Sequence, residues 1–336
     1  MSTKQRTALV IGATGGVGGA IAERLLADGW RIRALNRDPE RAREGREAFE
    51  WVKGDSMVEA EVVAAAQGCD VIVHGANPPG YKNWAGLQMP MLASTIAAAR
   101  AVGARILFPG TVYNYGADAF PSLTEASPQT PISRKGAIRV RMEDALRDSG
   151  VPVLIVRAGD YFGPTGGRNK WLSEGLVKPD RPVTSVTYPG PLEVAHAWAY
   201  LPDVAETFVQ LLKTDLGRFE TFHMQGHEIT GHGLVAALQQ AAGRKLSVGR
   251  LPWLALAVAA PFNESLREMQ EMRYLWNRPV VMDNAKLVAR LGAEPRTPLV
   301  EALRSALVGQ GSLPPLMGRD RPRSGQGGEV TTGLHA

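Results

Sequence analysis

Seven residues near the N-terminus have the types and spacing needed to bind a diphosphate. They read Gly-Ala-Thr-Gly-Gly-Val-Gly, follow an apolar run over residues 7–11, and precede a helical pattern over residues 17–28. The first glycine permits a sharp turn, the middle ones let backbone N–H groups approach phosphate oxygens, and the last lets the helix pack against the sheet. The positive end of the helix dipole adds to this attraction. In this context the loop predicts dinucleotide binding through Gly12, Thr14, Gly15, Gly16, Val17 and Gly18.

The residues about 20 positions beyond this loop indicate which dinucleotide is preferred. NAD-binding proteins commonly place a carboxylate there, which binds the ribose 2′-hydroxyl. This chain has Asn36 and Arg37 instead. A guanidinium can pair with a 2′-phosphate through two hydrogen bonds, so the sequence favours NADP(H) and leaves NAD(H) open. The alternative for Arg37 is a solvated surface cation.

Short apolar runs alternate with helical patterns through the first 164 residues. Apolar strands separated by helix-length gaps are typical of a parallel sheet covered on both faces. We therefore predict an α/β fold, a Rossmann-type doubly wound parallel sheet over residues 1–164, to which residues 195–215 return. The predicted strands cover residues 7–11, 31–35, 48–52, 71–74, 105–109 and 153–157, and the helices cover 17–28, 58–66, 89–102 and 134–149.

Beyond residue 164 the pattern is less regular. We predict a smaller mixed α/β C-terminal substrate lobe over residues 165–308. Its helical patterns cover residues 202–213, 231–242 and 282–291, and a strand pattern covers 219–223. The apolar run 251–260 is about half of a bilayer span and predicts a buried or interface helix. Residues 309–336 are rich in Gly, Pro, Ser and Arg, which predicts a disordered tail.

From about residue 8 to residue 307 the sequence resembles the extended or atypical short-chain dehydrogenase/reductase family, the epimerase/dehydratase branch. The resemblance rests on the glycine loop, on Thr-Val-Tyr-Asn-Tyr-Gly over 111–116, and on Arg-Ala-Gly-Asp-Tyr-Phe-Gly-Pro over 157–164. It also rests on Leu-Pro-Asp-Val-Ala over 201–205 and Asp-Asn-Ala-Lys over 283–286. It implies further cofactor contacts at the adenine edge and beside the nicotinamide, from Asp55, Ser56, Gly75, Ala76, Asn77 and Gly159.

The helix over residues 134–149 departs from this family. The family's catalytic Tyr-x-x-x-Lys pair precedes a Glu, and counting back from Glu143 finds Arg139 in the Lys place and Lys135 in the Tyr place. The segment instead resembles the Lys-x-x-Ile-Arg-x-x-x-Glu of the isoflavone-reductase-like branch, which implies that Lys135 handles a proton and contacts the cofactor. Lys135 would act either as a neutral amine or as a protonated donor to a developing oxyanion. The alternative is an ion-paired exposed helix face.

Three further residues are candidates for the substrate oxygen. The resemblance places Thr111 where the family has a Ser or Thr hydroxyl that hydrogen-bonds the substrate, and Tyr113 is a nearby phenol that could replace the missing one. Asp160 adds a carboxylate near the nicotinamide, unless it caps a turn. The predicted substrate-lining side chains indicate a hydrophobic or aromatic substrate, although ordinary core packing is the alternative. They are Trp84, Trp171, His196 and Trp198.

The composition excludes several other classes of protein. The net charge of +5 comes from local arginine clusters without a nucleic-acid reading module, so no nucleic-acid partner is expected. One cysteine, Cys69, permits no internal disulfide, and neither a signal peptide nor a membrane span is evident, so we expect a cytoplasmic protein without a membrane partner. The spacing of the histidines predicts no metal site. A homodimer is compatible with the sequence.

These features together predict an NADP(H)-dependent reductase. The expected reaction transfers a hydride to a small hydrophobic or aromatic carbonyl or enone compound, with Lys135 and Thr111 at the substrate oxygen. Two alternatives stay open. One is a nucleotide-sugar epimerase or dehydratase, which the missing Tyr disfavours, and the other is a non-catalytic protein that senses NADP(H), which the missing Tyr favours.

Overall fold

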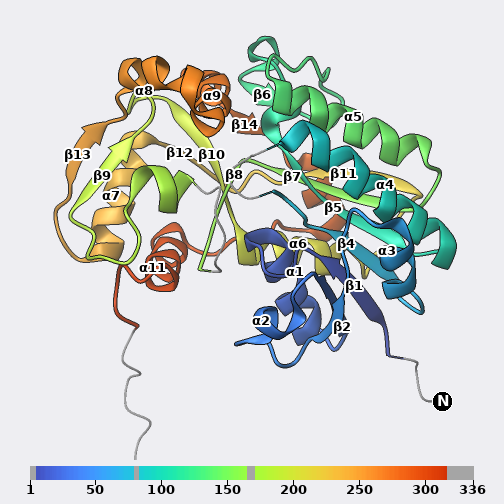
Figure 1. The fold of residues 1–336 in the computed structure, drawn as a ribbon. Coiled ribbons are helices and arrows are strands. Elements are labelled where there is room, and N and C mark those ends of the chain that lie inside the picture. The colour runs from blue at the N-terminus through green and yellow to red at the C-terminus, as the bar shows by residue number, and fades with distance from the viewer. Residues whose placement is uncertain (1–4, 79–82, 165–170, 316–336) are drawn as a thin grey trace, which may run out of the picture.

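The computed structural model describes residues 5–78, 83–164 and 171–315 of the chain and is built around one parallel sheet (Figure 1). Seven strands lie in the order β11-β7-β5-β4-β1-β2-β3, and every neighbouring pair is parallel. The strands are β1 (Thr7–Ile11), β2 (Arg31–Asn36), β3 (Glu50–Lys53), β4 (Val71–His74), β5 (Arg105–Thr111), β7 (Val153–Ala158) and β11 (Phe219–His223).

Helices cover both faces of this sheet, which explains why its central strands carry almost no polar side chains. Every residue of β1, β4 and β7 is buried. One face packs against α1 (Gly16–Ala27) and α6 (Leu201–Leu211), with α2 (Pro39–Arg43) and α10 (Ala285–Leu291) at its margins. The other face packs against α3 (Glu59–Ala65), α4 (Trp84–Val102) and α5 (Arg134–Asp148). The predicted Rossmann-type parallel sheet is confirmed.

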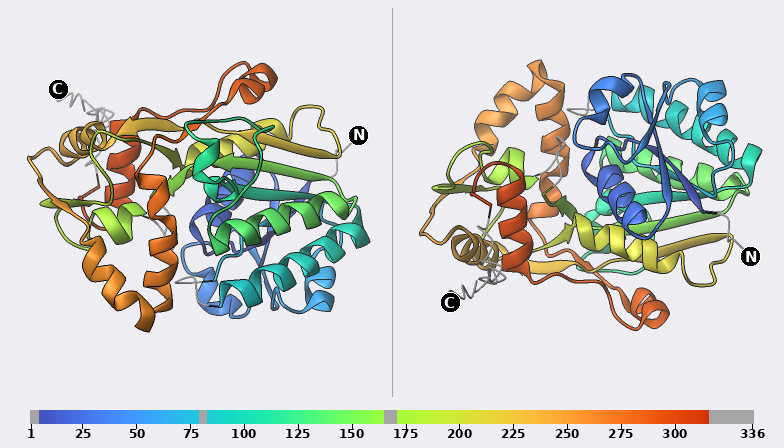
Figure 2. Two further views of the ribbon diagram at one scale, coloured as in Figure 1. Left: turned by 90° about the horizontal axis from the view of Figure 1, so that it is seen from above. Right: turned by 90° about the horizontal axis from the view of Figure 1, so that it is seen from below.

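A second lobe stands beside the carboxyl ends of the sheet (Figure 2). It contains the three-stranded sheet β12-β10-β8 and the pair β13-β9. Its core consists mainly of large apolar and aromatic side chains. The strands are β8 (Asp160–Phe162), β9 (Ser185–Tyr188), β10 (Ala195–Tyr200), β12 (His227–Thr230) and β13 (Ser247–Arg250), and the helices are α7 (Gly231–Ala242), α8 (Trp253–Ala259), α9 (Glu264–Glu271) and α11 (Leu299–Gly309).

The chain passes between the two lobes more often than its local patterns indicate. Strand β10 belongs to the second lobe, and the chain returns to the first at α6, which packs against α1. Strand β11 then forms the edge of the main sheet beside β7. The predicted helix over 282–291 is in part wrong. Val281–Met282 forms a short strand, β14, that pairs with β6 (Ser122–Leu123), and the helix begins only after it.

Two predictions near the C-terminus also need correction. The run 251–260 is not a buried helix, because most of α8 is exposed and its Leu254 side chain is 84% exposed. The predicted tail begins later than residue 309. Ser312 is buried, and the backbone N–H groups of Ser312 and Leu313 donate to the carbonyl of Leu307. The remainder of the predicted tail, residues 316–336, lies outside the described residues.

Candidate active site

The glycine loop lies where β1 ends between β2 and β4, at the point where the sheet order reverses. Gly12 has φ +90°, and a Cβ there would lie 2.6 Å from the carbonyl carbon of Gly75. A Cβ on Gly18 would collide with the carbonyl oxygen of Gly12. The N–H of Gly15 donates to that same oxygen at 2.9 Å, which closes the turn before α1 begins. This tight cradle leaves room for a diphosphate at the positive end of the α1 dipole.

The residues predicted at the adenosine side lie at the carboxyl ends of β2 and β3. The side chain of Asn36 accepts a hydrogen bond from the N–H of Asp38 at 2.9 Å, and Asp55 accepts one from the N–H of Met57 at 2.9 Å. The Arg37 side chain is exposed and makes no ion pair or hydrogen bond with the described residues. Its guanidinium is therefore available to an anionic ligand.

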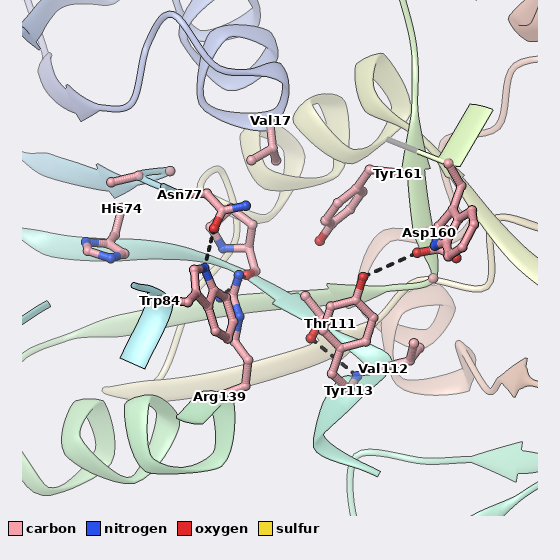
Figure 3. A pocket seen from close by; sticks show the side chains of 15 residues that line it. Val17, His74, Asn77, Trp84, Thr111, Val112, Tyr113, Arg139, Asp160 and Tyr161 are labelled. Atoms are coloured by element: carbon pink, nitrogen blue, oxygen red, sulfur yellow. Dashed lines mark hydrogen bonds between the residues drawn. The ribbon is translucent and has the colours of Figure 1, made fainter. Parts of the chain in front are cut away.

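A cavity of about 90 Å³ lies between the carboxyl ends of β4 and β5 and the second lobe (Figure 3). That volume is enough for one ring-sized group, below the roughly 300–1,000 Å³ of a complete ligand pocket. The cavity brings together residues from both lobes and from the glycine loop. They are Val17, His74, Gly75, Ala76, Asn77, Trp84, Pro109, Thr111, Val112, Tyr113, Arg139, Gly159, Asp160, Tyr161 and Trp171.

Thr111 and Tyr113 face this cavity from the end of β5. The Thr111 side chain accepts a hydrogen bond from the N–H of Tyr113 at 3.3 Å and so starts the short 3₁₀ helix Val112–Asn114. Gly136 in the first turn of α5 packs directly against the carbonyl oxygen of Tyr113, where a Cβ would collide. The hydroxyl hydrogen of Thr111 is not used by any described residue, so it can be donated to a ligand.

The Tyr113 hydroxyl donates to Asp160 Oδ1 at 3.5 Å, and Asp160 Oδ2 lies 2.7 Å from His196 Nε2 (Figure 3 shows the first of these contacts). The other ring nitrogen, His196 Nδ1, lies 3.3 Å from the carbonyl oxygen of Leu275. Both ring nitrogens thus face oxygen atoms, so a hydrogen bond between His196 Nε2 and Asp160 Oδ2 needs a proton on one of these two atoms. The His196 ring stacks on Trp276 at 4.0 Å, which fixes its orientation.

Arg139, in the place of the family's Lys, lies on the opposite wall of the cavity. Its guanidinium donates to the carbonyl of Pro109 at 3.3 Å and lies 5.5 Å above the Trp84 ring. The Trp84 indole N–H donates to Asn77 Oδ1 at 2.6 Å. Arg139 thus brings a positive charge to the cavity.

His74 supplies a buried acceptor at the cavity wall. Burial, with a smaller contribution from Arg139, lowers the pKa of His74 to about 3, so the ring is neutral. The Thr95 hydroxyl donates to the carbonyl of Met91, so His74 Nδ1 must donate to Thr95 Oγ1, 2.8 Å away. His74 Nε2 is consequently an acceptor, and it has no hydrogen-bond partner among the described residues. A ligand hydroxyl or amide would satisfy it.

Lys135 does not line the cavity. It is buried beneath α9, where Nζ lies 3.7 Å from Glu268 Oε2 and donates to the Glu268 carbonyl at 3.5 Å. Burial lowers the pKa of Lys135 to about 8, although Glu268 and Glu271 act in the opposite direction, so the amine is mainly protonated at neutral pH. The structure therefore gives Lys135 contacts that hold α9 against α5.

The four predicted substrate-lining residues separate into two groups. Trp84 and Trp171 line the cavity. His196 reaches the cavity only through Asp160, and Trp198 is buried in the core of the second lobe. Sequence reasoning did not select His74, Arg139 or Tyr161 as site residues. Arg139 could have been found from its position four residues after Lys135, whereas nothing local distinguishes His74 from a core histidine.

A buried ion pair lies behind the 3₁₀ helix that carries Tyr113. Arg157 pairs with Glu143, and both side chains are 1% exposed. Glu143 Oε1 accepts from Asn114 Nδ2 at 2.8 Å, and Arg157 donates to the Tyr115 hydroxyl at 2.7 Å and to His223 Nε2 at 2.8 Å. The ion pair thereby fixes both residues that follow Tyr113 in the chain.

The buried histidines predict a loss of stability in mild acid. Burial, aided by Arg157, lowers the pKa of His223 to about 3, and burial likewise lowers that of His74 to about 3 and that of His227 to about 4. The unfolded chain binds these protons near pH 6.5, whereas the folded chain does not, so the free energy of unfolding falls as the pH drops below 6.5. Each histidine lowers it by roughly 1.4 kcal/mol per pH unit.

Chemical denaturation between pH 7.5 and about 5 measures this slope. We expect His223→Gln to reduce it and His232→Gln, a change at an exposed position, to leave it unaltered. A slope in His223→Gln equal to that of the parent would show that His223 does not titrate in this way.

Comparison with known proteins identifies the family. Residues 12–185 match a family model described as NAD(P)H-binding. The chain belongs to this NAD(P)H-binding family. The matched segment begins at Gly12 and contains the glycine loop, Thr111 and Asp160, and the loop geometry fits the diphosphate of such a dinucleotide. The matched segment includes five of the seven strands of the main sheet, from β2 to β7.

Relatives of this NAD(P)H-binding chain include both reductases and epimerases. It is 27% identical over 259 residues to a ceramide reductase of Caulobacter vibrioides, covering 75% of this chain and 76% of that protein. The UDP-glucose 4-epimerase of Bifidobacterium longum, solved with NAD+ and UDP, is similar in structure with a TM-score of 0.70 at 16% identity, covering 91% and 100% of the two chains. That of Stenotrophomonas maltophila has a TM-score of 0.71 at 18% identity, covering 91% and 98%. These two solved structures share the fold of this chain.

Proposed function

We propose that this chain is an NADP(H)-dependent reductase of a hydrophobic carbonyl compound. The observation that carries the proposal is the convergence of Thr111, Tyr113 and Asp160 on one cavity that Val17 of the glycine loop also lines. A bound reduced nicotinamide supplies a hydride to an electrophilic carbon. The chain must then hold the substrate oxygen and deliver a proton to it.

Tyr113 takes the role of proton donor in this proposal. The hydroxyl of Thr111 donates to the substrate oxygen, and the phenol proton of Tyr113 moves to that oxygen as negative charge develops on it. A proton in the hydrogen bond between Asp160 and His196 is the nearest replacement for the phenol. Lys135, which sequence reasoning placed at the substrate oxygen, acts at α9 instead because its amine contacts Glu268.

Two residues on the opposite wall orient the ligand. Arg139 and the unpartnered acceptor on His74 lie where hydroxyl or amide groups of the dinucleotide would pass. Asn77 is held toward the cavity by Trp84. These contacts position the ligand and need not change during the reaction.

The preference for NADP(H) predicts a selective effect at Arg37. In Arg37→Ala, the Kd for NADPH should rise about 10- to 100-fold, because a charge-assisted contact with the 2′-phosphate is lost. The Kd for NADH should change little. Fluorescence titration with both dinucleotides measures this, and Arg41→Ala, also exposed and nearby, serves as the control. Equal losses for both dinucleotides would contradict a 2′-phosphate contact.

The substrate is proposed to be apolar around its carbonyl. Trp84 and Trp171 provide aromatic surface to the cavity, and the similar ceramide reductase acts on a lipid. A keto lipid with long acyl chains is therefore the first substrate class to test. The cavity itself has room only for the reacting group of such a lipid.

A substrate panel with NADPH tests this proposal. It contains hydrophobic ketones, enones, a keto analogue of ceramide and UDP-glucose. Oxidation of NADPH by an apolar ketone or enone, without epimerisation of UDP-glucose, is the expected result. Epimerisation of UDP-glucose would favour the epimerase function of the structural neighbours, and tight binding of NADPH without any turnover would favour a redox sensor.

A further inference from the structure

Helix α8 and the 3₁₀ turn after it expose an apolar surface that nothing described in the chain covers. Leu254, Val258 and Phe262 are 84%, 77% and 92% exposed. They recur every four residues, which places them on one side of the segment. Residues 251–262 include no charged side chain. A contiguous exposed apolar surface of this kind marks an interaction site. We call these three side chains the α8 face.

The opposite side of α8 leads toward the cavity. Trp253 is buried, and its indole N–H donates to the carbonyl of Pro189 at 2.5 Å. Its ring lies 6.5 Å from that of Trp171, which lines the cavity. In Figure 2, α8 and α9 project together from the second lobe. The rings of Trp253 and Trp171 therefore lie between α8 and the cavity.

Three exposed arginines lie near α8 in the chain or in space. Arg250 precedes α8, Arg267 donates to the carbonyl of Pro261 at 3.0 Å, and Arg273 lies 5.5 Å from the Trp253 ring. Helix α9 carries three acids. Glu268 and Glu271 pair with Arg134, and Glu268 also pairs with Lys135, while Glu264 accepts a hydrogen bond from the N–H of Asn83 at 3.2 Å. An apolar face bordered by arginines is complementary to a lipid bilayer with anionic headgroups and an apolar interior.

We propose that the α8 face inserts shallowly into an anionic lipid bilayer, with Arg250, Arg267 and Arg273 contacting the headgroups. Such a contact needs only one apolar helix face. Among the described helices, none has the length and apolar character required to cross a membrane. The proposal replaces the expectation of no membrane partner. It goes beyond the proposed reductase function and does not depend on it, because vesicle binding requires no turnover.

Vesicle flotation of the full chain tests this proposal. We expect the parent to float with vesicles of phosphatidylcholine and phosphatidylglycerol in equal parts, and much less with phosphatidylcholine alone. The triple variant Leu254→Asp, Val258→Asp, Phe262→Asp should lose at least about tenfold in binding, because the three apolar side chains proposed to enter the bilayer become charged. Val288→Asp, at a 37% exposed position on α10, is the matched control and should bind as the parent does.

Three outcomes would overturn the proposal. They are a parent that binds anionic vesicles no better than neutral ones, a triple variant that binds like the parent, and a parent dimer that the triple variant dissociates in sedimentation velocity. The last would mean that a second copy of the chain covers the α8 face. A second triple variant, Leu254→Ser, Val258→Ser, Phe262→Ser, controls for folding. If its melting curve matches that of the parent, a loss of vesicle binding is not caused by unfolding.

Discussion

Replacing Tyr113 by Phe is expected to lower kcat of the reductase about 10²- to 10⁴-fold while leaving the Kd for NADPH unchanged. The reason is that the substitution removes one hydroxyl, the proposed proton donor, and keeps the ring that lines the cavity. Asp160→Asn should produce a smaller loss, since the carboxylate that contacts both the Tyr113 hydroxyl and His196 is replaced by an amide. Stopped-flow single-turnover kinetics with NADPH measures both effects.

Tyr188→Phe is the matched control for Tyr113→Phe. Tyr188 is buried in the core of the second lobe and does not line the cavity, so its loss of a hydroxyl should change kcat no more than a few-fold. Lys135→Ala is the decisive comparison for the proton donor. If Lys135→Ala abolishes the chemical step and Tyr113→Phe retains it, the proton comes from the amine and not from the phenol.

Replacing Glu143 by Ala is expected to destabilise the fold by about 3–5 kcal/mol. The reason is that the buried Arg157 guanidinium would keep its charge and lose its carboxylate partner. The side chain of Asn114 would also lose its acceptor, which should loosen the 3₁₀ helix that carries Tyr113. Urea denaturation followed by circular dichroism measures the change in the free energy of unfolding.

Asp144→Ala provides the control on the same helix. Asp144 pairs with Arg147 at 2.7 Å, but both side chains are about half exposed, so this pair should contribute about 0–1 kcal/mol. A Glu143→Ala variant that is no less stable than Asp144→Ala would mean that Arg157 is solvated or otherwise compensated.

The sheet and the glycine loop could be predicted because their signals are local. An apolar strand, a glycine turn and a helix follow one another between Thr7 and Ala27, and the positive φ at Gly12 is one that glycine adopts readily. Thr111, Tyr113 and Asp160 were proposed from the family resemblance, and the structure shows that each lies at the carboxyl end of a strand or just after it. Strand ends of a parallel sheet meet at one edge, so these side chains had to converge.

The contacts of Lys135 could not be predicted from its spacing in the sequence. The sequence places Lys135 and Arg139 one turn apart on α5, but it does not reveal that Glu268, 133 residues later, lies over Lys135. Arg139 faces the cavity and Lys135 faces α9 because of that long-range contact. The role of His74 was likewise hidden, since its tautomer depends on Thr95 of α4 and its neutral state depends on burial and on Arg139.

The exposure of α8 was equally inaccessible to sequence patterns. A run of apolar residues usually indicates burial, and only the tertiary structure shows which side of it lacks a cover. Trp253 packs inward, while Leu254 and Val258 face outward. The same composition therefore gave two readings, buried helix or interface, and the fold supports an interface.

Transfer of deuterium from NADPH labelled at nicotinamide C4 to an apolar ketone tests the proposed reaction most directly. We expect the parent to form an alcohol that carries one deuterium on the former carbonyl carbon, and the Tyr113→Phe variant to form it at least about a hundredfold more slowly. Complete absence of labelled product, whether an alcohol from a ketone or a saturated ketone from an enone, with NADPH bound at saturation, would contradict the assignment of this cavity as a reductase site.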